Sequence, residues 1–323
     1  MVLINLSLGS ISIPFKSIIS SLLGNEQTNN TWQYIVTSYR LPKTITAILV
    51  GSSLAISGLL MQTLFRNPLA GPFVLGISSG ASLGVATLLL SAGIFGSALA
   101  SLASSNYAIV LAASFGSFLV LLVVLIAATK VRNTMSILII GLMFGSFTSA
   151  IISILSYFSN AEQLQQFMFW SFGSVGNLNW SDISIFLGLV LVGLLLILFI
   201  LKPLNSLLLG EDYAKSMGVN ISKTRIITLI ATSILTGVCT AFAGPIAFIG
   251  LAVPHLSKLF IVTSNHKILL PAVAIMGAIL MLISDTIAQL PNSTYTLPIN
   301  AVTTLFGAPI VIWLLVRKRK ILF

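Results

Sequence analysis

Ionisable side chains inside apolar stretches are the residues of this chain whose types could carry chemistry, and they are few. Asp285, His255 and Lys258 interrupt otherwise uncharged runs. Ionisable groups in a membrane are costly and usually functional, so a coupled ion or proton would bind at such residues. They form no chain of carboxylates across a run, so ion- or proton-coupled transport is poorly supported. The alternatives are structural: for Asp285 a helix-end carboxylate bonded to a neighbouring hydroxyl, and for His255 a packing histidine after Pro254.

Motifs for catalysis, metal binding and nucleotide binding are absent from the sequence. It contains no HExxH, no Asp-rich diphosphate motif, no G-x-x-x-x-G-K-[ST] phosphate loop and no serine nucleophile with a plausible base. The single cysteine, Cys239, excludes an internal disulfide and a cysteine metal cluster. We therefore expect no enzyme activity and no metal or cofactor bound by this chain. Uphill transport would need energy from a partner or a gradient.

The composition is that of an all-α polytopic membrane protein. The chain is 57% hydrophobic and 7% charged, with a mean hydropathy of +1.08, whereas a soluble domain has about 25% charged residues. The net charge of +10 is scattered over short loops without a basic face, so we expect a lipid bilayer as the surroundings and no nucleic-acid partner. Runs of about 20 apolar residues span a bilayer. Nine are predicted: 44–64, 73–92, 108–128, 135–157, 183–201, 226–243, 246–264, 268–288 and 299–316.

Lysine and arginine fall almost entirely on one side of these spans. Thirteen of the 16 lie in alternate gaps and in the C-terminal tail, and only Lys16, Arg40 and Lys43 lie in the other set. Because cytoplasmic loops collect Lys and Arg, the C-terminus is predicted inside and residues 1–43 form an exterior segment. No signal peptide is visible, so we expect a further helix before Met1 that this sequence lacks.

Two regions differ from ordinary spans and loops. Residues 158–182 mix polar and aromatic side chains and are predicted to form a short interfacial helix outside. Residues 202–225 form the longest inside loop, where Glu211 and Asp212 favour a helix start and Gly218 a helix stop. Such a helix is a candidate handle for a soluble partner, although many inside loops hold one without that role. No repeat and no second domain is found, so residues 1–323 are predicted to form a single transmembrane domain.

Glycines recur at four-residue spacing in two spans. Gly76, Gly80 and Gly84 share one helix face, and Gly141 and Gly145 repeat the spacing. Small residues let helix backbones approach closely in lipid, so tight packing is the first interpretation. A mobile pore-lining helix is the alternative.

Four blocks of sequence resemble the iron-chelate and cobalamin (FecCD-type) permease family of ABC importers. They are RLPKTITAILVGSSLAISGLLMQTLFRNPLAGPFVLGISSGASLG (40–84), LNSLLLGEDYAKSMGV (204–219), GPIAFIGLAVPHLSKLF (244–260) and LPINAVTTLFGAPIVIWLL (297–315). The blocks keep the family's order and spacing, and the resemblance covers Gly9 to Arg317.

The resemblance implies a type II ABC-importer permease fold with ten helices per subunit, of which this chain lacks the first. It also implies a dimer with a second permease subunit, either a copy or a paralogue. Two cytoplasmic ATP-binding cassette subunits, which bring ATP and Mg, drive alternating access at the dimer axis. An extracytoplasmic substrate-binding protein docks outside, and the location is the bacterial cytoplasmic membrane.

Three sets of residues take roles from the resemblance. Asp212, Tyr213, Ala214 and Gly218, with Glu211 beside them, match the motif that contacts the ATPase, with Asp in place of the usual Glu and Tyr in place of Ala. Arg40 and Lys43 match basic residues that dock the binding protein, while Gln289 stands where a third is expected. Asn133, Thr134, Met135 and Ser136 match the region of the inner gate, and an ordinary helix start is the alternative there.

The substrate is predicted to be an iron chelate, first a ferric siderophore, because that substrate is frequent in the family. Haem and cobalamin are the next candidates. Two interpretations from other classes stay open. One is a gradient-driven secondary transporter that would need Asp285 or His255 at its coupling site, and the other is a membrane scaffold or receptor that moves nothing.

Overall fold

The computed structural model describes residues 1–23, 30–91, 105–131, 134–291, 293 and 295–316. In these residues it consists of helices joined by loops, with no strand. An apolar helix occupies each of the nine predicted spans. Six are long and apolar enough to cross a membrane: Asn30–Phe65 (α3, η1 and α4), Asn106–Lys130 (α8), Thr134–Tyr157 (α9), Trp180–Leu207 (α11), Ile221–Ala243 (α13) and His266–Ala288 (α15). The all-α, multi-pass prediction is therefore confirmed.

Three apolar helices are shorter, and two of them correct the predicted spans. Within 73–92, a turn of 3-10 helix (η2, Pro72–Leu75) precedes α5 (Ile77–Leu90), and the chain bends between them at Gly76, where φ is +75°. With 14 residues, α5 is about 21 Å long, shorter than the roughly 30 Å hydrocarbon layer. Within 246–264, the 12-residue α14 (Ile249–Phe260) begins after Phe248 at φ 65°. The third, α16 (Ile299–Val316), contains Pro309.

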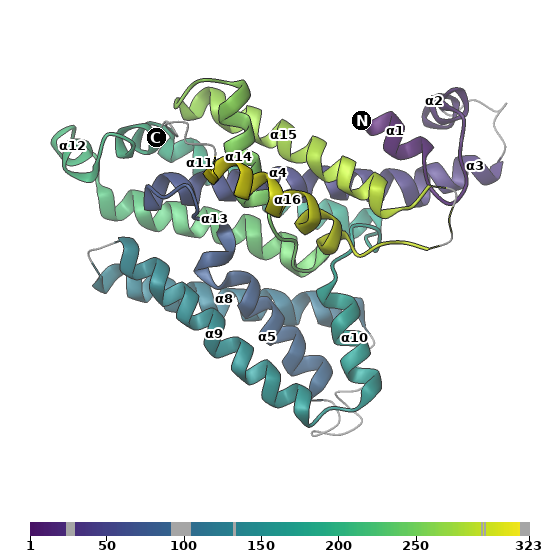
Figure 1. The fold of residues 1–323 in the computed structure, drawn as a ribbon, viewed down its shortest axis with the longest axis horizontal. Helices are drawn as coiled ribbons and strands as arrows, with labels where there is room; N and C mark the ends of the chain where they lie inside the picture. The colour runs from purple at the N-terminus through teal and green to yellow at the C-terminus, as the bar shows by residue number, and fades with distance from the viewer. Residues whose placement is uncertain (24–29, 92–104, 132–133, 292, 294, 317–323) are drawn as a thin grey trace.

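The two ends of the helix bundle differ in how many basic residues they carry. At one end, which we call the basic end, Asn205 on α11 bonds His266 on α15, and Arg225 on α13 donates to the carbonyl of Val131 after α8. The described basic residues that lie here are Arg66, Lys130, Lys202, Lys215, Lys223, Arg225, Lys258 and Lys267. At the other end, the outer end, lie Arg40 and Lys43. Figure 1 shows the last described helix, α16, finishing on the same side as α12 (Glu211–Ser216), and the N-terminus on the opposite side.

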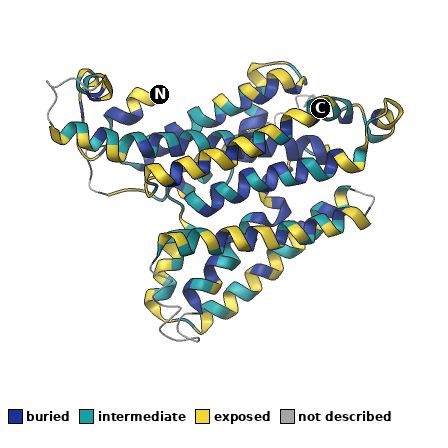
Figure 2. Cartoon of the chain, turned by 180° about the vertical axis from the view of Figure 1, so that it is seen from behind, coloured by how far each residue is buried: buried dark blue, intermediate teal, exposed yellow. Residues whose placement is uncertain are grey.

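The core forms around α4, which packs against α15, α13 and α14. Glycines set these distances: a Cβ on Gly51 would lie 2.3 Å from the carbonyl oxygen of Gly277, and one on Gly58 would lie 1.6 Å from that of Gly250. In Figure 1, α5, α8 and α9 form a second group below α13, and Figure 2 shows burial concentrated where the central helices meet. By contrast, α9 buries little of its surface within this chain.

Close packing is confirmed for the glycine series, although Gly76 precedes α5 and faces Gly141 on α9, so it does not share a helix face with Gly80 and Gly84. A Cβ on Gly80 would lie 2.6 Å from the carbonyl oxygen of Gly116, and one on Gly84 would lie 2.0 Å from that of Ala112, both on α8. Backbone therefore meets backbone along this contact, and no larger side chain fits.

Short helices lie at both ends of the bundle. The predicted interfacial helix is present as α10 (Ala161–Ser171), and it starts at a capping box between Asn160 and Gln163. The N-terminal segment contains α1 (Val2–Ser7), α2 (Phe15–Leu23) and α3 (Asn30–Ile35), which continues through η1 (Val36–Arg40) into α4 (Leu41–Phe65). At the basic end, α11 and α13 extend to residues 207 and 221, so the loop that holds α12 is shorter than the predicted 202–225.

Candidate functional site

The predicted coupling residues lie on α12, a single exposed turn between two long helices. The carboxylates of Glu211 and Asp212 stand in its first turn and Lys215 in its last, where each charge opposes the nearby end of the helix dipole. Ala214 is fully buried and anchors the turn. The side chains of Asp212 and Tyr213 are exposed, and Tyr213 is 54% exposed. Two of the predicted coupling side chains are therefore accessible to a partner.

Gly218 ends α12 in the way the sequence predicts. Its φ is +81°, its N–H donates to the carbonyl of Lys215 over 3.0 Å, and the N–H of Val219 donates to that of Ala214 over 3.0 Å. These two bonds form a Schellman motif, in which a left-handed residue closes the helix. A Cβ on Gly218 would meet no atom within 4 Å. The surface beyond the turn is therefore open.

Glu211 has a different role from its neighbours. Its carboxylate pairs with the guanidinium of Arg225 at 3.2 Å, and the same guanidinium donates to the carbonyl of Val131 over 3.4 Å. Arg225 is a buried residue at the start of α13. This contact connects α12 to α13 and to the end of α8.

Three of the four predicted gate residues begin α9. Thr134 and Ser136 are half-buried and Met135 is 43% exposed, whereas Asn133 lies outside the described residues. They lie at the basic end, close in sequence to Val131, which Arg225 contacts. Their role in a gate stays a prediction.

At the outer end, Asp285 is the centre of a buried polar network. The residue is 2% exposed. Its Oδ1 pairs with the ammonium of Lys43 at 3.1 Å, and its Oδ2 accepts from the amides of Asn5 at 2.9 Å and Gln289 at 2.7 Å. The carboxylate is thus a satisfied structural group, although its partners are an ammonium and two amides instead of the expected hydroxyl.

Arg40 holds the N-terminal segment against this network. Its guanidinium donates to the carbonyls of Leu6 at 2.7 Å and Ser7 at 2.9 Å, and also to that of Ile11. Asn5 completes the contact, since its amide oxygen accepts from the hydroxyl of Thr44 at 2.7 Å. Both predicted docking residues, Arg40 and Lys43, are therefore engaged inside the chain. Their role towards a partner stays a prediction.

The histidines make structural hydrogen bonds. The Nε2 of His255 lies 2.6 Å from the carbonyl oxygen of Pro68, which agrees with the packing interpretation. His266, which sequence reasoning missed, is 1% exposed, with Thr63 at 2.9 Å from Nε2 and Asn205 at 2.7 Å from Nδ1. It joins the basic ends of α4, α11 and α15. The sequence signal that could have indicated it is its position directly after the asparagine that caps α15.

Among the described residues, no cluster of His, Cys, Asp or Glu could hold a metal ion. The features that do stand out lie at opposite ends of the helix bundle: a buried polar network around Asp285 and the exposed short helix α12.

Known proteins share both the sequence and this architecture. The hemin transport system permease protein HmuU of Yersinia pestis is 36% identical over 319 residues, which is 98% of this chain and 94% of that protein. The vitamin B12 import system permease protein BtuC of Klebsiella pneumoniae is 39% identical over 288 residues, which is 89% of this chain and 84% of that protein.

Solved structures agree. An inward-facing conformation of a metal-chelate type ABC transporter superposes with a TM-score of 0.84 at 30% identity and covers 98% of this chain and 95% of that one. PsaBC from Streptococcus pneumoniae shares the fold alone, with a TM-score of 0.53 at 16% identity.

The FecCD transport family model matches residues 1–317. Relatives of this kind are permease subunits and are not themselves enzymes. The chain therefore belongs to the FecCD transport family, as a multi-pass membrane permease of an ABC importer.

Proposed function

We propose that this permease imports an iron chelate by alternating access at a dimer axis, driven by two ATP-binding cassette subunits that dock on α12. The observation that carries the proposal is the form of α12. It presents Asp212 and Tyr213 to solvent, while Glu211 and Ala214 fix it to the bundle. An ATPase movement applied to this turn would reach α11, α13 and, through Arg225, the end of α8.

The basic end faces the cytoplasm in this proposal, because short cytoplasmic loops collect Lys and Arg. The C-terminal tail, whose residues 317–320 are all basic, would lie on the same side. The substrate-binding protein would then dock on the outer end, near α1, α2 and the start of α4. Arg40 and Lys43 are already bonded within this chain, so in this proposal each would interact both with the chain and with that partner.

The substrate class is supported by the names of the relatives. A hemin permease and a metal-chelate type transporter are both similar to the chain over 98% of its length, and a vitamin B12 permease over 89%. All three substrates enclose a metal ion in an organic ligand. We place a ferric siderophore first, with haem and cobalamin as the alternatives.

Reconstitution tests the proposal directly. The permease is placed in proteoliposomes with its cognate ATPase and binding protein, with ATP on the ATPase side, and uptake of a labelled ferric siderophore, haem and cobalamin is compared. We expect uptake of one ligand that needs ATP, the ATPase and the binding protein together. A Walker-site mutant of the ATPase is the matched control.

Two results would contradict the proposal. Uptake that an uncoupler abolishes and that ignores loss of the ATPase would identify a gradient-driven transporter. No flux of any of the three ligands, with every partner bound, would favour a scaffold or receptor. Uptake of haem or cobalamin alone would keep the importer and correct the substrate.

A further inference from the structure

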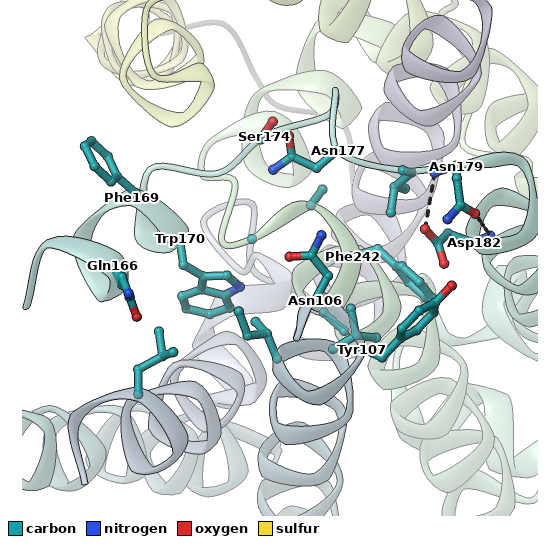
Figure 3. Close-up of a pocket in the computed structure, with 17 residues that line it drawn as sticks. Asn106, Tyr107, Gln166, Phe169, Trp170, Ser174, Asn177, Asn179, Asp182 and Phe242 are labelled. Atoms are coloured by element: carbon teal, nitrogen blue, oxygen red, sulfur yellow. Dashed lines mark hydrogen bonds between the residues drawn. The ribbon is translucent and has the colours of Figure 1, made fainter. Parts of the chain in front are cut away.

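A cavity of about 540 Å³ lies near the outer end, apart from α12 and from the Asp285 network. It lies between the start of α8, α10, the start of α11 and the end of α13. In the view of Figure 3, Asp182 and Tyr107 border it on one side and Gln166 and Trp170 on the other, with Asn106 between them. A volume in the range of about 300–1,000 Å³ is typical of small-molecule sites and far exceeds that of a bare ion.

The one charged side chain among the described residues of the lining is Asp182. It is 9% exposed, and its Oδ2 accepts the backbone N–H of Asn179 at 3.2 Å as part of the cap of α11. Within the described part of the chain, its Oδ1 has neither a hydrogen bond nor an ion pair. Opposite charges attract and like charges repel, so this carboxylate makes the cavity favour a cationic ligand over an anionic one.

Four aromatic residues also line the cavity. Trp170 and Phe242 are half-buried, whereas Tyr107 is 59% and Phe169 62% exposed. The ring of Phe242 is held by stacking on Phe186, with centroids 5.5 Å apart, and that of Trp170 by stacking on Phe167, with centroids 6.1 Å apart. Aromatic faces attract organic cations. A hydrated inorganic ion would gain nothing from these walls.

We propose that this cavity binds a small organic ammonium ion, with its charge at the free oxygen of Asp182 and its alkyl groups against the aromatic rings. The amides of Asn106, Gln166 and Asn177 line the same space and can bond a hydroxyl or other polar group on the ligand. The ammonium belongs either to a free solute or to the headgroup of an outer-leaflet lipid. This inference is independent of the transported substrate.

Choline is a suitable probe, and binding is measured on the permease with its ATPase in nanodiscs of phosphatidylglycerol, which has no ammonium group. Equilibrium dialysis with labelled choline gives the affinity. We expect saturable binding that Asp182→Asn weakens at least tenfold. Asparagine keeps an oxygen for the cap of α11, so the thermal midpoint should change little. The matched control is Glu162→Gln, which removes an exposed carboxylate on α10 outside the cavity and should leave binding unchanged.

Phosphatidylcholine nanodiscs distinguish the two sources. Choline binding that is suppressed in those discs identifies a lipid headgroup as the occupant, and binding that persists identifies a free solute. No saturable binding by the wild type, or equal binding by wild type and Asp182→Asn, would overturn the inference. Competition by an equal concentration of glycerol would also overturn it, because it would indicate a site for neutral polyols.

Discussion

The outer polar network and the α12 turn use similar residues in opposite ways. At the outer end, Lys43 and Asp285 pair with each other, and Asn5 and Gln289 complete the carboxylate's contacts. At the basic end, Asp212 and Tyr213 lie exposed on a turn held by one ion pair and one buried alanine. Charge alone therefore does not show whether a side chain is available to a partner. That is set by what the fold places next to each side chain.

The difference has an energetic consequence. Buried polar groups contribute stability only while all of their partners are present, because each orphaned group keeps its desolvation cost. Exposed charges contribute little to folding and are free to contact a partner. The two regions should therefore respond differently to the same kind of substitution.

The largest effect is expected from Asp285→Ala. It leaves the ammonium of Lys43 and two amides without their acceptor, which should cost roughly 3 kcal/mol of stability, since breaking a buried pair costs about 3–5 kcal/mol and Lys43 keeps some access to water. Thermal unfolding of the detergent-solubilised permease measures this. The matched variant Asp212→Ala should change stability by less than about 0.5 kcal/mol. Equal losses for the two would remove the contrast between the regions.

A second effect, on partner binding instead of stability, is expected at α12. Asp212→Lys should leave the thermal midpoint unchanged but weaken ATPase binding by about tenfold or more, which is the typical size of an interface hot spot. Co-purification and substrate-stimulated ATP hydrolysis measure it. The control Glu162→Lys makes the same charge reversal on the exposed surface of α10. Normal coupling by Asp212→Lys would count against the docking role of α12.

The smallest effect is expected at Arg40, where two substitutions separate its structural role from its docking role. Arg40→Lys keeps the charge but cannot reach three carbonyls as the guanidinium does, so stability should fall by about 1–2 kcal/mol while docking of the binding protein survives. Arg40→Glu should weaken docking as well, more at low salt than at high salt. Docking of Arg40→Glu that is unchanged at low ionic strength would leave Arg40 a purely structural role.

The sequence predicted most of the helices but not all of their lengths. Apolar runs define membrane helices because hydrocarbon leaves the backbone no other partner, and the helices at 44–64, 108–128 and 135–157 follow. Nothing in composition marks where a helix stops halfway. The starts of α5 and α14 follow left-handed residues, Gly76 and Phe248, each of which lies against another helix.

Particular side chains show the same difference between what the sequence could and could not predict. Gly218 was predictable as a helix stop, because that position needs a conformation that glycine adopts without strain. The partners of Asp285 were not, because Asn5 lies 280 residues away in sequence. Thr63 and Asn205, the hydrogen-bond partners of His266, also lie far from it in sequence. The cavity beside Asp182 was likewise invisible to local reasoning.

The sequence by itself determined that this is an α-helical membrane protein, because hydrophobicity and charge asymmetry are local properties of the chain, and its resemblance to a known family indicated a permease. Only the tertiary structure decided which polar groups form hydrogen bonds and ion pairs inside the fold and which remain exposed to partners. Hydrogen bonds and ion pairs depend on distances of about 3 Å between residues far apart in sequence, and packing alone sets those distances.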